Sequence, residues 1–290
     1  MFDVFRNRLE VSGILTTVTA LRVGAGRSSD PLSSDLPVMK DAFRRPIIPG
    51  ASFKGAMRSR LESFLRGVNP DLAEDPVNLT SGKQNGVIRD LKKKYANDDL
   101  QLTQEILKKT DCISQFFGAP WLAGKFQVRD LMVISDRWFG QYQERNGVMI
   151  DRDTEVQSSG KLYDFQVVPA GTPFLFKLVV ENAVEWELGL LLVGLHQFAT
   201  QQVPLGGGRS RGLGVVELVI DRMDWVDVTQ GEAIDRTKLM TYLQQAATGQ
   251  PMQDYGVLEN KELKQQWMNA LLSKLNSTPM TTTVKRELAK

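Results

Sequence analysis

A helix start at Pro49-Gly-Ala-Ser-Phe-Lys-Gly-Ala-Met-Arg58 could hold an anion. The first backbone N–H groups of a helix have no intrahelical partner, and the helix dipole adds partial positive charge, so phosphate binds readily there. Gly50 and Ser52 allow close approach to the backbone, and Lys54 and Arg58 are four residues apart on one face. An ordinary capped helix with a solvated basic edge fits the same residues, so both interpretations stay open.

Basic residues are concentrated around this helix start. The chain has 36 Lys and Arg against 34 Asp and Glu, a net charge of +2 that does not by itself indicate a polyanionic partner. Between Lys40 and Arg66, however, seven basic and two acidic residues give a local charge of +5, which leaves −3 for the remainder. A basic patch on a near-neutral chain is typical of a specific polyanion-binding surface.

A glycine-rich loop is a second candidate phosphate site. It reads Gly206-Gly-Gly-Arg-Ser-Arg-Gly-Leu-Gly214, with five glycines around Arg209, Ser210 and Arg211. Such a loop can direct main-chain N–H groups and guanidinium groups toward a phosphate backbone. It lacks the Gly-Lys-Ser/Thr ending of a P-loop and the G-x-G-x-x-G spacing of a dinucleotide fold. The alternative is a flexible turn between a helix and a strand.

Three aspartates, Asp30, Asp35 and Asp41, lie in one loop close to the basic stretch. A carboxylate beside a phosphodiester can hold a divalent cation, orient a water, or accept the proton of a ribose 2′-hydroxyl. An ordinary Asp, with a pKa of about 3.9, is a weak base, so this chemistry needs a metal or a shifted pKa. Loop aspartates also build turns and caps, which is the interpretation we favour for Asp30, before Pro31.

Composition limits cysteine and histidine chemistry. One cysteine, Cys112, excludes a disulfide within the chain and any structural zinc site that needs several thiolates. One histidine, His196, excludes mechanisms that need two. We expect Cys112 to be a small buried hydrophobe and His196 to be a packed, hydrogen-bonded core residue. The cluster Lys92–Lys94 is expected to be a solvated face.

The hydrophobic pattern predicts an α+β protein of 290 residues with a ferredoxin-like sheet and insertions. Strands are predicted at Leu9–Val23, Phe126–Ser135, Leu162–Val168, Phe174–Val180 and Val215–Ile220, and helices after Pro49, at Gln101–Lys109 and at Val184–Gln202. Asn146-Gly147 is the strongest turn dipeptide. Leu263, Trp267, Leu271 and Leu275 predict one more helix, and the last fifteen residues a frayed tail.

The composition excludes collagen, a coiled-coil rod and wholesale disorder, since 42% of the residues are hydrophobic and 24% charged. The longest apolar run, Leu188–Leu195, is too short to cross a bilayer. The N-terminus lacks the layout of a signal peptide. Together these features indicate a soluble, cytoplasmic protein.

Four segments carry motifs in a fixed order. They are Asp35-Leu-Pro-Val-Met-Lys-Asp41, Pro46–Arg58, the middle region Asn146–Arg152 with Leu162–Phe165 and Val168–Thr172, and Gly206–Gly214. In this order they resemble the RAMP proteins of CRISPR systems, most closely the repeated backbone subunit of type III (Csm and Cmr) effector complexes. The likeness spans Leu9 to Ile220.

The resemblance implies a ferredoxin-like (RRM-like) palm over residues 1–229, with a helical insertion at 66–110 and a thumb hairpin at 137–160. A helical extension and tail would follow over 230–290. The thumb, which in the family separates guide from target RNA, would include Asn146, Gly147, Ile150, Asp151 and Arg152. The guide RNA would be bound by Gly50, Ser52, Lys54, Arg58, Arg209, Ser210 and Arg211.

The resemblance also implies an activity and partners. Asp35 aligns with the aspartate that such subunits use, with Mg²⁺ or Mn²⁺, to cut target RNA by in-line attack of the 2′-hydroxyl. The partners would be a CRISPR guide RNA, single-stranded target RNA, other RAMP subunits and a large signature subunit, with no membrane. Many relatives carry paired cysteines near the position of Cys112, so a family zinc site would be incomplete and no structural zinc is expected here.

Two alternatives remain. The chain could be a structural RNA-binding subunit of the same complex with no chemistry of its own. It could also be a processing endonuclease for CRISPR transcripts, although such enzymes rely on acid–base side chains such as histidine, and the single His196 argues against that function.

Overall fold

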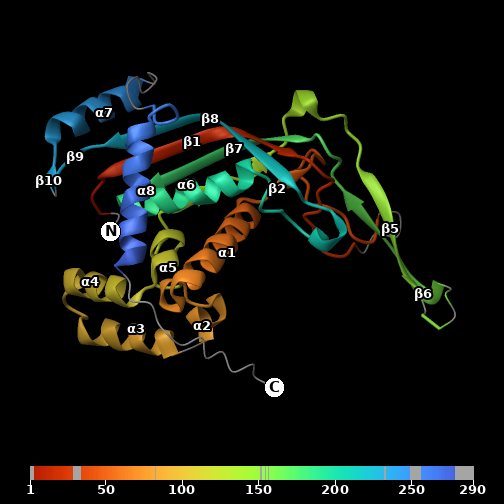
Figure 1. Ribbon diagram of the computed structural model, residues 1–290, viewed down its shortest axis with the longest axis horizontal. Coiled ribbons are helices and arrows are strands. Elements are labelled where there is room, and N and C mark those ends of the chain that lie inside the picture. The colour runs from red at the N-terminus through yellow and green to blue at the C-terminus, as the bar shows by residue number, and fades with distance from the viewer. Residues whose placement is uncertain are drawn as a thin grey trace.

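A four-stranded antiparallel sheet with the strand order β3-β7-β1-β8 forms the centre of the protein (Figure 1). The computed structural model describes residues 3–28, 34–81, 83–150, 152–153, 155, 157–231, 233–248 and 256–277. The sheet strands are β1 (Asn7–Thr17), β3 (Phe126–Val128), β7 (Pro173–Glu181) and β8 (Val216–Asp227). Helix α1 (Gly50–Val68) connects β1 to β3, and α6 (Glu185–Ala199) connects β7 to β8. This βαββαβ order confirms the predicted ferredoxin-like palm.

Strand β1 holds the sheet together because it pairs with both β7 and β8. Its residues alternate between buried and half-buried positions along its whole length, so one face packs on the helices. Gly13 lies at a register shift against β8, and a Cβ atom there would come within 2.1 Å of the Val219 carbonyl oxygen. Only glycine fits this close approach.

Aromatic packing joins the sheet to its two helices. The ring of Phe53, on α1, lies 5.0 Å from Phe176 of β7 and 4.3 Å from Phe198 of α6, between ring centroids. All three side chains are buried, so α1 and α6 cover the same face of the sheet. The apolar residues whose spacing predicted both helices therefore form part of the hydrophobic core.

Helices fill the segment between α1 and β3. They are η1 (Pro70–Leu72), α2 (Pro76–Ser81), α3 (Lys83–Lys94), α4 (Asp99–Lys109) and α5 (Cys112–Phe117). Asp98 and Asp111 cap α4 and α5 by accepting backbone N–H bonds at 2.9 Å. Cys112 is buried and Lys92–Lys94 are exposed, as predicted.

A long hairpin of β5 (Gln143–Ile150) and β6 (Gln157–Val167) extends from the palm (Figure 1). The predicted turn at Asn146-Gly147 is wrong, because these residues pair with Asp164 and Tyr163 in the middle of the hairpin. A Cβ atom at position 147 would collide with the Tyr163 ring at 2.3 Å, so the glycine makes room for that ring rather than for a turn. Strand β6 pairs with β5 and not with the palm sheet.

The predicted strand at Phe126–Ser135 is also divided. It contains β3, then β4 (Leu131–Met132), which pairs with β2 (Ile47–Ile48), and η2 (Ser135–Arg137) begins at its last residue. The break between β3 and β4 contains Asp130, whose carboxylate accepts the N–H of Gly50 at 2.7 Å and so links this segment to α1.

The C-terminal part comprises β9 (Thr229–Gln230), β10 (Ala233–Ile234), α7 (Arg236–Thr248) and α8 (Lys261–Asn276). Trp267 and Leu271, from the predicted stripe, are buried in the main core, so α8 packs against α6. The predicted tail lies outside the described residues except for its first two. Across the described part of the chain, no helix is long and apolar enough to cross a membrane.

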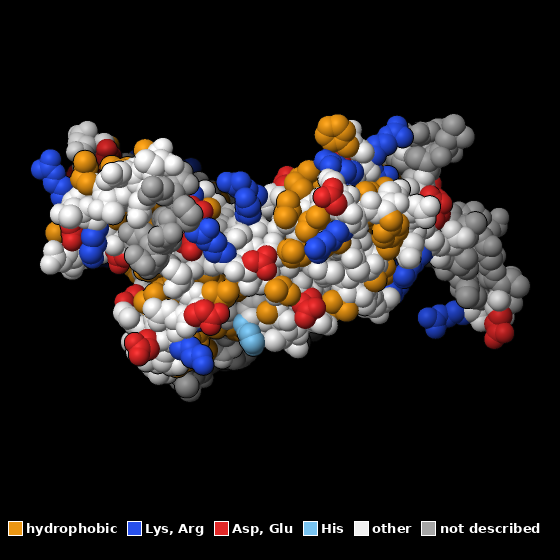
Figure 2. Space-filling model, turned by 90° about the horizontal axis from the view of Figure 1, so that it is seen from above, with side chains coloured by type: hydrophobic (Ala, Val, Ile, Leu, Met, Phe, Trp, Pro, Cys, Tyr) orange, Lys and Arg blue, Asp and Glu red, His pale blue; other side chains and the backbone are white. Residues whose placement is uncertain are grey.

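His196 is not the core residue that the sequence predicted. It lies on α6 but is exposed, and it lines a pocket of about 440 Å³ between α6, β8 and α8 (pale blue in Figure 2). His196 lies outside the apolar stripe of α6, because Leu195 and Phe198 occupy the buried side of this helical turn.

Replacing Trp267 by Ala is expected to lower the free energy of unfolding by about 3–5 kcal/mol, because the side chain is only 1% exposed. Urea denaturation measures the change. Leu272→Ala is the matched control, since Leu272 is on the same helix and 50% exposed. Equal effects of the two substitutions would show that α8 is not part of the core.

Candidate nucleic-acid interface

The chain that follows β1 brings three loops together. We call residues 17–25 the hub segment, residues 206–214 the glycine-rich loop, and residues 34–41 the acidic loop. The hub segment makes main-chain hydrogen bonds of 2.8–2.9 Å to the root of the hairpin and to both loops. The pairs are Leu21 with Val168, Arg22 with Gly207, Ala20 with Gly214, Val23 with Met39 and Ala25 with Pro37. Segments far apart in the sequence thus form one surface.

The glycine-rich loop approaches the hub segment so closely that only glycine fits. A Cβ atom on Gly206 would lie 2.1 Å from the carbonyl oxygen of Arg22, and the φ of Gly206 is +72°. Between Gly208 and Gly212, both left-handed, the single turn η3 (Arg209–Arg211) presents its side chains to solvent. Fixed glycines therefore display two exposed arginines and Ser210 beside the hairpin.

Asp35 is bound to the hairpin through Asp164. The N–H of Asp35 donates to the Asp164 carboxylate at 2.9 Å, and the N–H of Asp164 lies 3.4 Å from Asp35 Oδ2. The bond from the Asp35 backbone is the main cause of a lowered pKa at Asp164, so this carboxyl stays ionised. Asp41 instead accepts hydrogen bonds from Arg45 in a turn, and Asp30 lies outside the described residues.

Asp35 and Asp164, which contact each other through backbone N–H groups and carboxylates, are the candidate ligands for a hard divalent cation. Mg²⁺ keeps several waters and commonly uses one or two protein carboxylates together with phosphate oxygens. Asp35 and Asp164 fit that donor set. Within the described residues, no three or more His, Cys, Asp or Glu side chains could hold an ion by themselves.

Three residues near Asp35 escaped the sequence analysis: Arg22, Tyr163 and Asp164. The Arg22 guanidinium lies 4.9 Å from the centroid of the Phe165 ring, and its Nε has no hydrogen-bond partner among the described residues. Arg211 reaches the Tyr163 hydroxyl at 3.5 Å. One cation of this surface, Arg22, thus lies over an aromatic ring of β6 and another, Arg211, contacts the hydroxyl of a second, an arrangement suited to backbone and base contacts. The sequence contains both Arg22 and the aromatic residues of β6, but they are too far apart along the chain for any local spacing to link them.

The start of α1 is less open than its sequence suggested. The Gly50 N–H is already bound to the Asp130 carboxylate, and a Cβ atom on Gly50 would lie 2.6 Å from the Val128 carbonyl oxygen. Ser52 is half-buried one turn away. Lys54 lies 5.9 Å from the Phe126 ring, and burial, together with the nearby Arg58, lowers the pKa of Lys54. Their contacts with RNA remain predictions.

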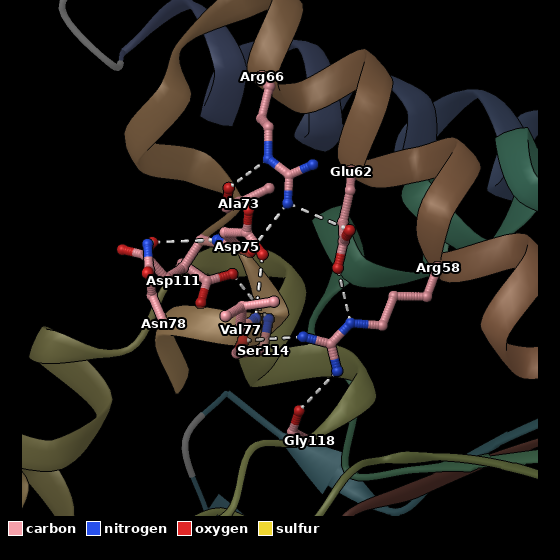
Figure 3. A network of polar contacts seen from close by, with 11 residues as sticks. Arg58, Glu62, Arg66, Ala73, Asp75, Val77, Asn78, Asp111, Ser114 and Gly118 are labelled. Carbon is pink, nitrogen blue, oxygen red and sulfur yellow. Dashed lines mark hydrogen bonds and ion pairs between the residues drawn. The ribbon is translucent and has the colours of Figure 1, made fainter. Parts of the chain in front are cut away.

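Arg58 points into a network that joins α1 to the helical insertion (Figure 3). Its three nitrogens donate to the Glu62 carboxylate (2.8 Å), the Gly118 carbonyl (3.0 Å) and the Ser114 hydroxyl (3.3 Å). Glu62 also accepts a bond from Arg66, which donates to two carbonyl groups between η1 and α2. These contacts give Arg58 a structural role, and its predicted phosphate contact remains untested.

The thumb residues lie along the hairpin. Asn146 and Gly147 pair with β6, as does the backbone of Ile150, opposite Gln157. Arg152 is exposed beyond the end of β5. Asp151 lies outside the described residues. Of the thumb residues that the structure describes with their side chains, Asn146 and Arg152 are thus carried away from the palm by the hairpin.

Comparison with known proteins finds a matching family model and similar proteins. A family model described as the RAMP superfamily matches residues 14–217. The chain is 25% identical over 228 residues to a protein named CRISPR system Cms endoribonuclease Csm3 from Enterococcus italicus, covering 76% of this chain and 94% of that protein. A protein of the same name from Mycobacterium tuberculosis is 38% identical over 76 residues, covering 23% of this chain and 32% of that protein.

Gly206→Ala is expected to lower the free energy of unfolding by about 1–3 kcal/mol, because alanine is strained at this positive φ and meets the Arg22 carbonyl. Thermal or urea unfolding measures the loss. Gly207→Ala is the control, since a Cβ atom there meets nothing within 4 Å. If both variants unfold alike, the close approach of the loop to the hub segment is not a constraint.

Proposed function

The chain belongs to the RAMP superfamily, and from this premise we propose that it is a guide-RNA-binding backbone subunit of a type III CRISPR interference complex that cleaves target RNA. The observation that carries the proposal is the meeting of the glycine-rich loop, the acidic loop and the hairpin at the hub segment. The endoribonuclease names of two similar proteins support the activity. We place this function in the cytoplasm.

Guide RNA binding rests on two exposed cations of this surface and a half-buried one. Arg209 and Arg211 extend from a turn held by glycines, and Arg22 lies over an aromatic ring of the hairpin. Guanidinium groups form paired hydrogen bonds with phosphate oxygens. The hairpin would reach between guide and target RNA, and neighbouring RAMP subunits and a large signature subunit would complete the assembly.

Cleavage rests on Asp35 at the root of the hairpin. The 2′-hydroxyl oxygen of the target RNA attacks the adjacent phosphorus, forming a P–O2′ bond and breaking the P–O5′ bond. Asp35 accepts the hydroxyl proton, and the departing 5′ oxygen takes a proton from water. Asp164 fixes the Asp35 backbone and keeps a negative charge beside it. Asp35 and Asp164 would hold Mg²⁺ or Mn²⁺, which stabilises the charge developing on the phosphate oxygens.

The double variant Arg209→Ala, Arg211→Ala is expected to weaken guide binding more at low salt than at high salt. Each lost phosphate contact reduces the slope of log K against log salt by about 1. Titration of labelled guide RNA at several salt concentrations measures the slope. Lys92→Ala, Lys93→Ala removes the same charge from the exposed end of α3 and should leave the slope unchanged. An unchanged slope in both variants would exclude the glycine-rich loop from the RNA contact.

Asp35→Ala is expected to reduce target cleavage by at least about 10²-fold while the complex still assembles. Labelled complementary RNA, incubated with the purified complex and Mg²⁺, reports the cuts, and size-exclusion chromatography reports assembly. Asp221→Ala, on an exposed position of β8, is the matched control and should cut normally. If Asp35→Ala leaves the cut pattern unchanged, the chain is a structural RNA-binding subunit instead.

A further inference from the structure

Two exposed and two half-buried aromatic rings meet basic side chains at the base of the hairpin. We call this group the aromatic–basic patch: Phe43, Arg44, Arg45, Trp138, Phe139 and Tyr142. Phe43 is 78% exposed, the highest value among the large apolar side chains of the described residues, and Phe139 is 59% exposed. Figure 2 shows hydrophobic side chains lying among Lys and Arg on the half of the molecule that carries the hairpin. Such rings are costly to leave in water, so they indicate a binding surface.

The turn that carries Phe43 is held in one conformation. The Asp41 carboxylate accepts the N–H of Phe43 (2.9 Å) and both the N–H and Nε of Arg45 (2.8 Å each). Arg44, at the tip, has a φ of +60°, which a non-glycine residue keeps only when its surroundings enforce it. The Tyr142 hydroxyl adds a 2.6 Å bond to the Arg44 carbonyl. The backbone that carries the exposed ring is therefore fixed before any partner arrives.

Aromatic and cationic groups alternate across the patch. The Arg45 guanidinium lies 5.0 Å from the Phe43 ring centroid, and the Lys40 ammonium lies 4.4 Å from that of Tyr142. The Trp138 ring contacts those of Phe139 and Tyr142, with centroids 5.1 and 5.2 Å apart. Of the nearby carboxylates, Asp41 is occupied by the turn, and Glu144 interacts electrostatically with Lys40. Rings with cations beside them suit the flat faces and phosphates of nucleic acid.

We propose that the aromatic–basic patch is a stacking platform for unpaired bases of single-stranded RNA, with Phe43 as its main ring. The inference rests on the proposed function, because it adds a base contact to an RNA-binding subunit. Every base has a π-face, so the platform accepts any sequence, as a subunit that carries changing guides requires. An apolar protein partner fits less well, since the rings are interleaved with charges.

The experiment uses the full chain with a fluorescent single-stranded guide RNA and compares Phe43→Ala, Phe43→Trp and Leu100→Ala. Leu100 is the control because it is 73% exposed, on α4. Phe43→Ala should weaken binding about tenfold, within the range found for loss of one stacked base. Phe43→Trp should restore binding. The salt slope should not change, because no phosphate contact is lost. All three variants should melt like the wild type.

Crosslinking identifies the partner directly. RNA containing 5-iodouridine, irradiated with the wild-type chain, should give peptides crosslinked at Phe43 or Phe139. If wild type binds guide RNA but Phe43→Ala binds equally well, or no crosslink maps to the patch, the platform is overturned while the proposed function stands. A Phe43→Ala variant that binds RNA normally but loses subunit association would make the patch a protein interface instead. Failure of wild type to bind any RNA would overturn both proposals.

Discussion

The surface proposed to bind RNA depends on the main chain of the hub segment. Its N–H and C=O groups bond to the acidic loop, which follows it closely in the sequence, and to the hairpin root and the glycine-rich loop, which lie more than a hundred residues further along the chain. An unpaired backbone group in a partly buried position costs free energy, so each loop that closes on the hub segment satisfies its own groups and those of the segment. Side chains can then vary on a framework that does not depend on them. This explains why the glycine-rich loop has glycine where its backbone touches the hub segment. Its arginines lie where the loop faces solvent.

The elements of the fold that could be predicted from sequence are those whose hydrophobic pattern extends over many residues. Alternation in β1 and β7 and helical spacing in α1, α6 and α8 each extend over several turns or pairs, and these elements are confirmed. Signals of one or two residues were unreliable. Asn146-Gly147 was predicted to be a turn but lies within the ladder of β5 and β6. Pairing with the eleven-residue strand β6 outweighs the local turn preference of these two residues. His196 was assigned to the core from its helix, although one position around a helix changes the face that a side chain occupies.

The candidate site was predictable only where a contiguous motif carries it. Asp35 and Arg209–Arg211 were given roles because of their motifs, whereas Asp164 was given no role although it lies in the Leu162–Phe165 motif, and Arg22 lies in no motif. Asp164 acquires its role from a bond to Asp35 across 129 positions of the chain. Arg22 acquires its role from a ring on β6. Both relations are products of the βαββαβ topology, which sets the acidic loop beside β6, and no spacing in a single sequence encodes them.

The charge of +5 between Lys40 and Arg66 shows why counting along a chain differs from counting over a surface. A helix turns its basic residues in several directions. Arg58 and Arg66 share the buried Glu62 and hold the helical insertion, while Arg60 donates to Gln197 of α6. These cations stabilise the protein itself. Lys40, Arg44 and Arg45 precede the helix and lie at the base of the hairpin, with Arg22 and the glycine-rich loop supplying more positive charge from elsewhere in the sequence. The charge that we propose faces RNA is therefore assembled by the fold, and the basic helix that suggested it mainly stabilises that fold.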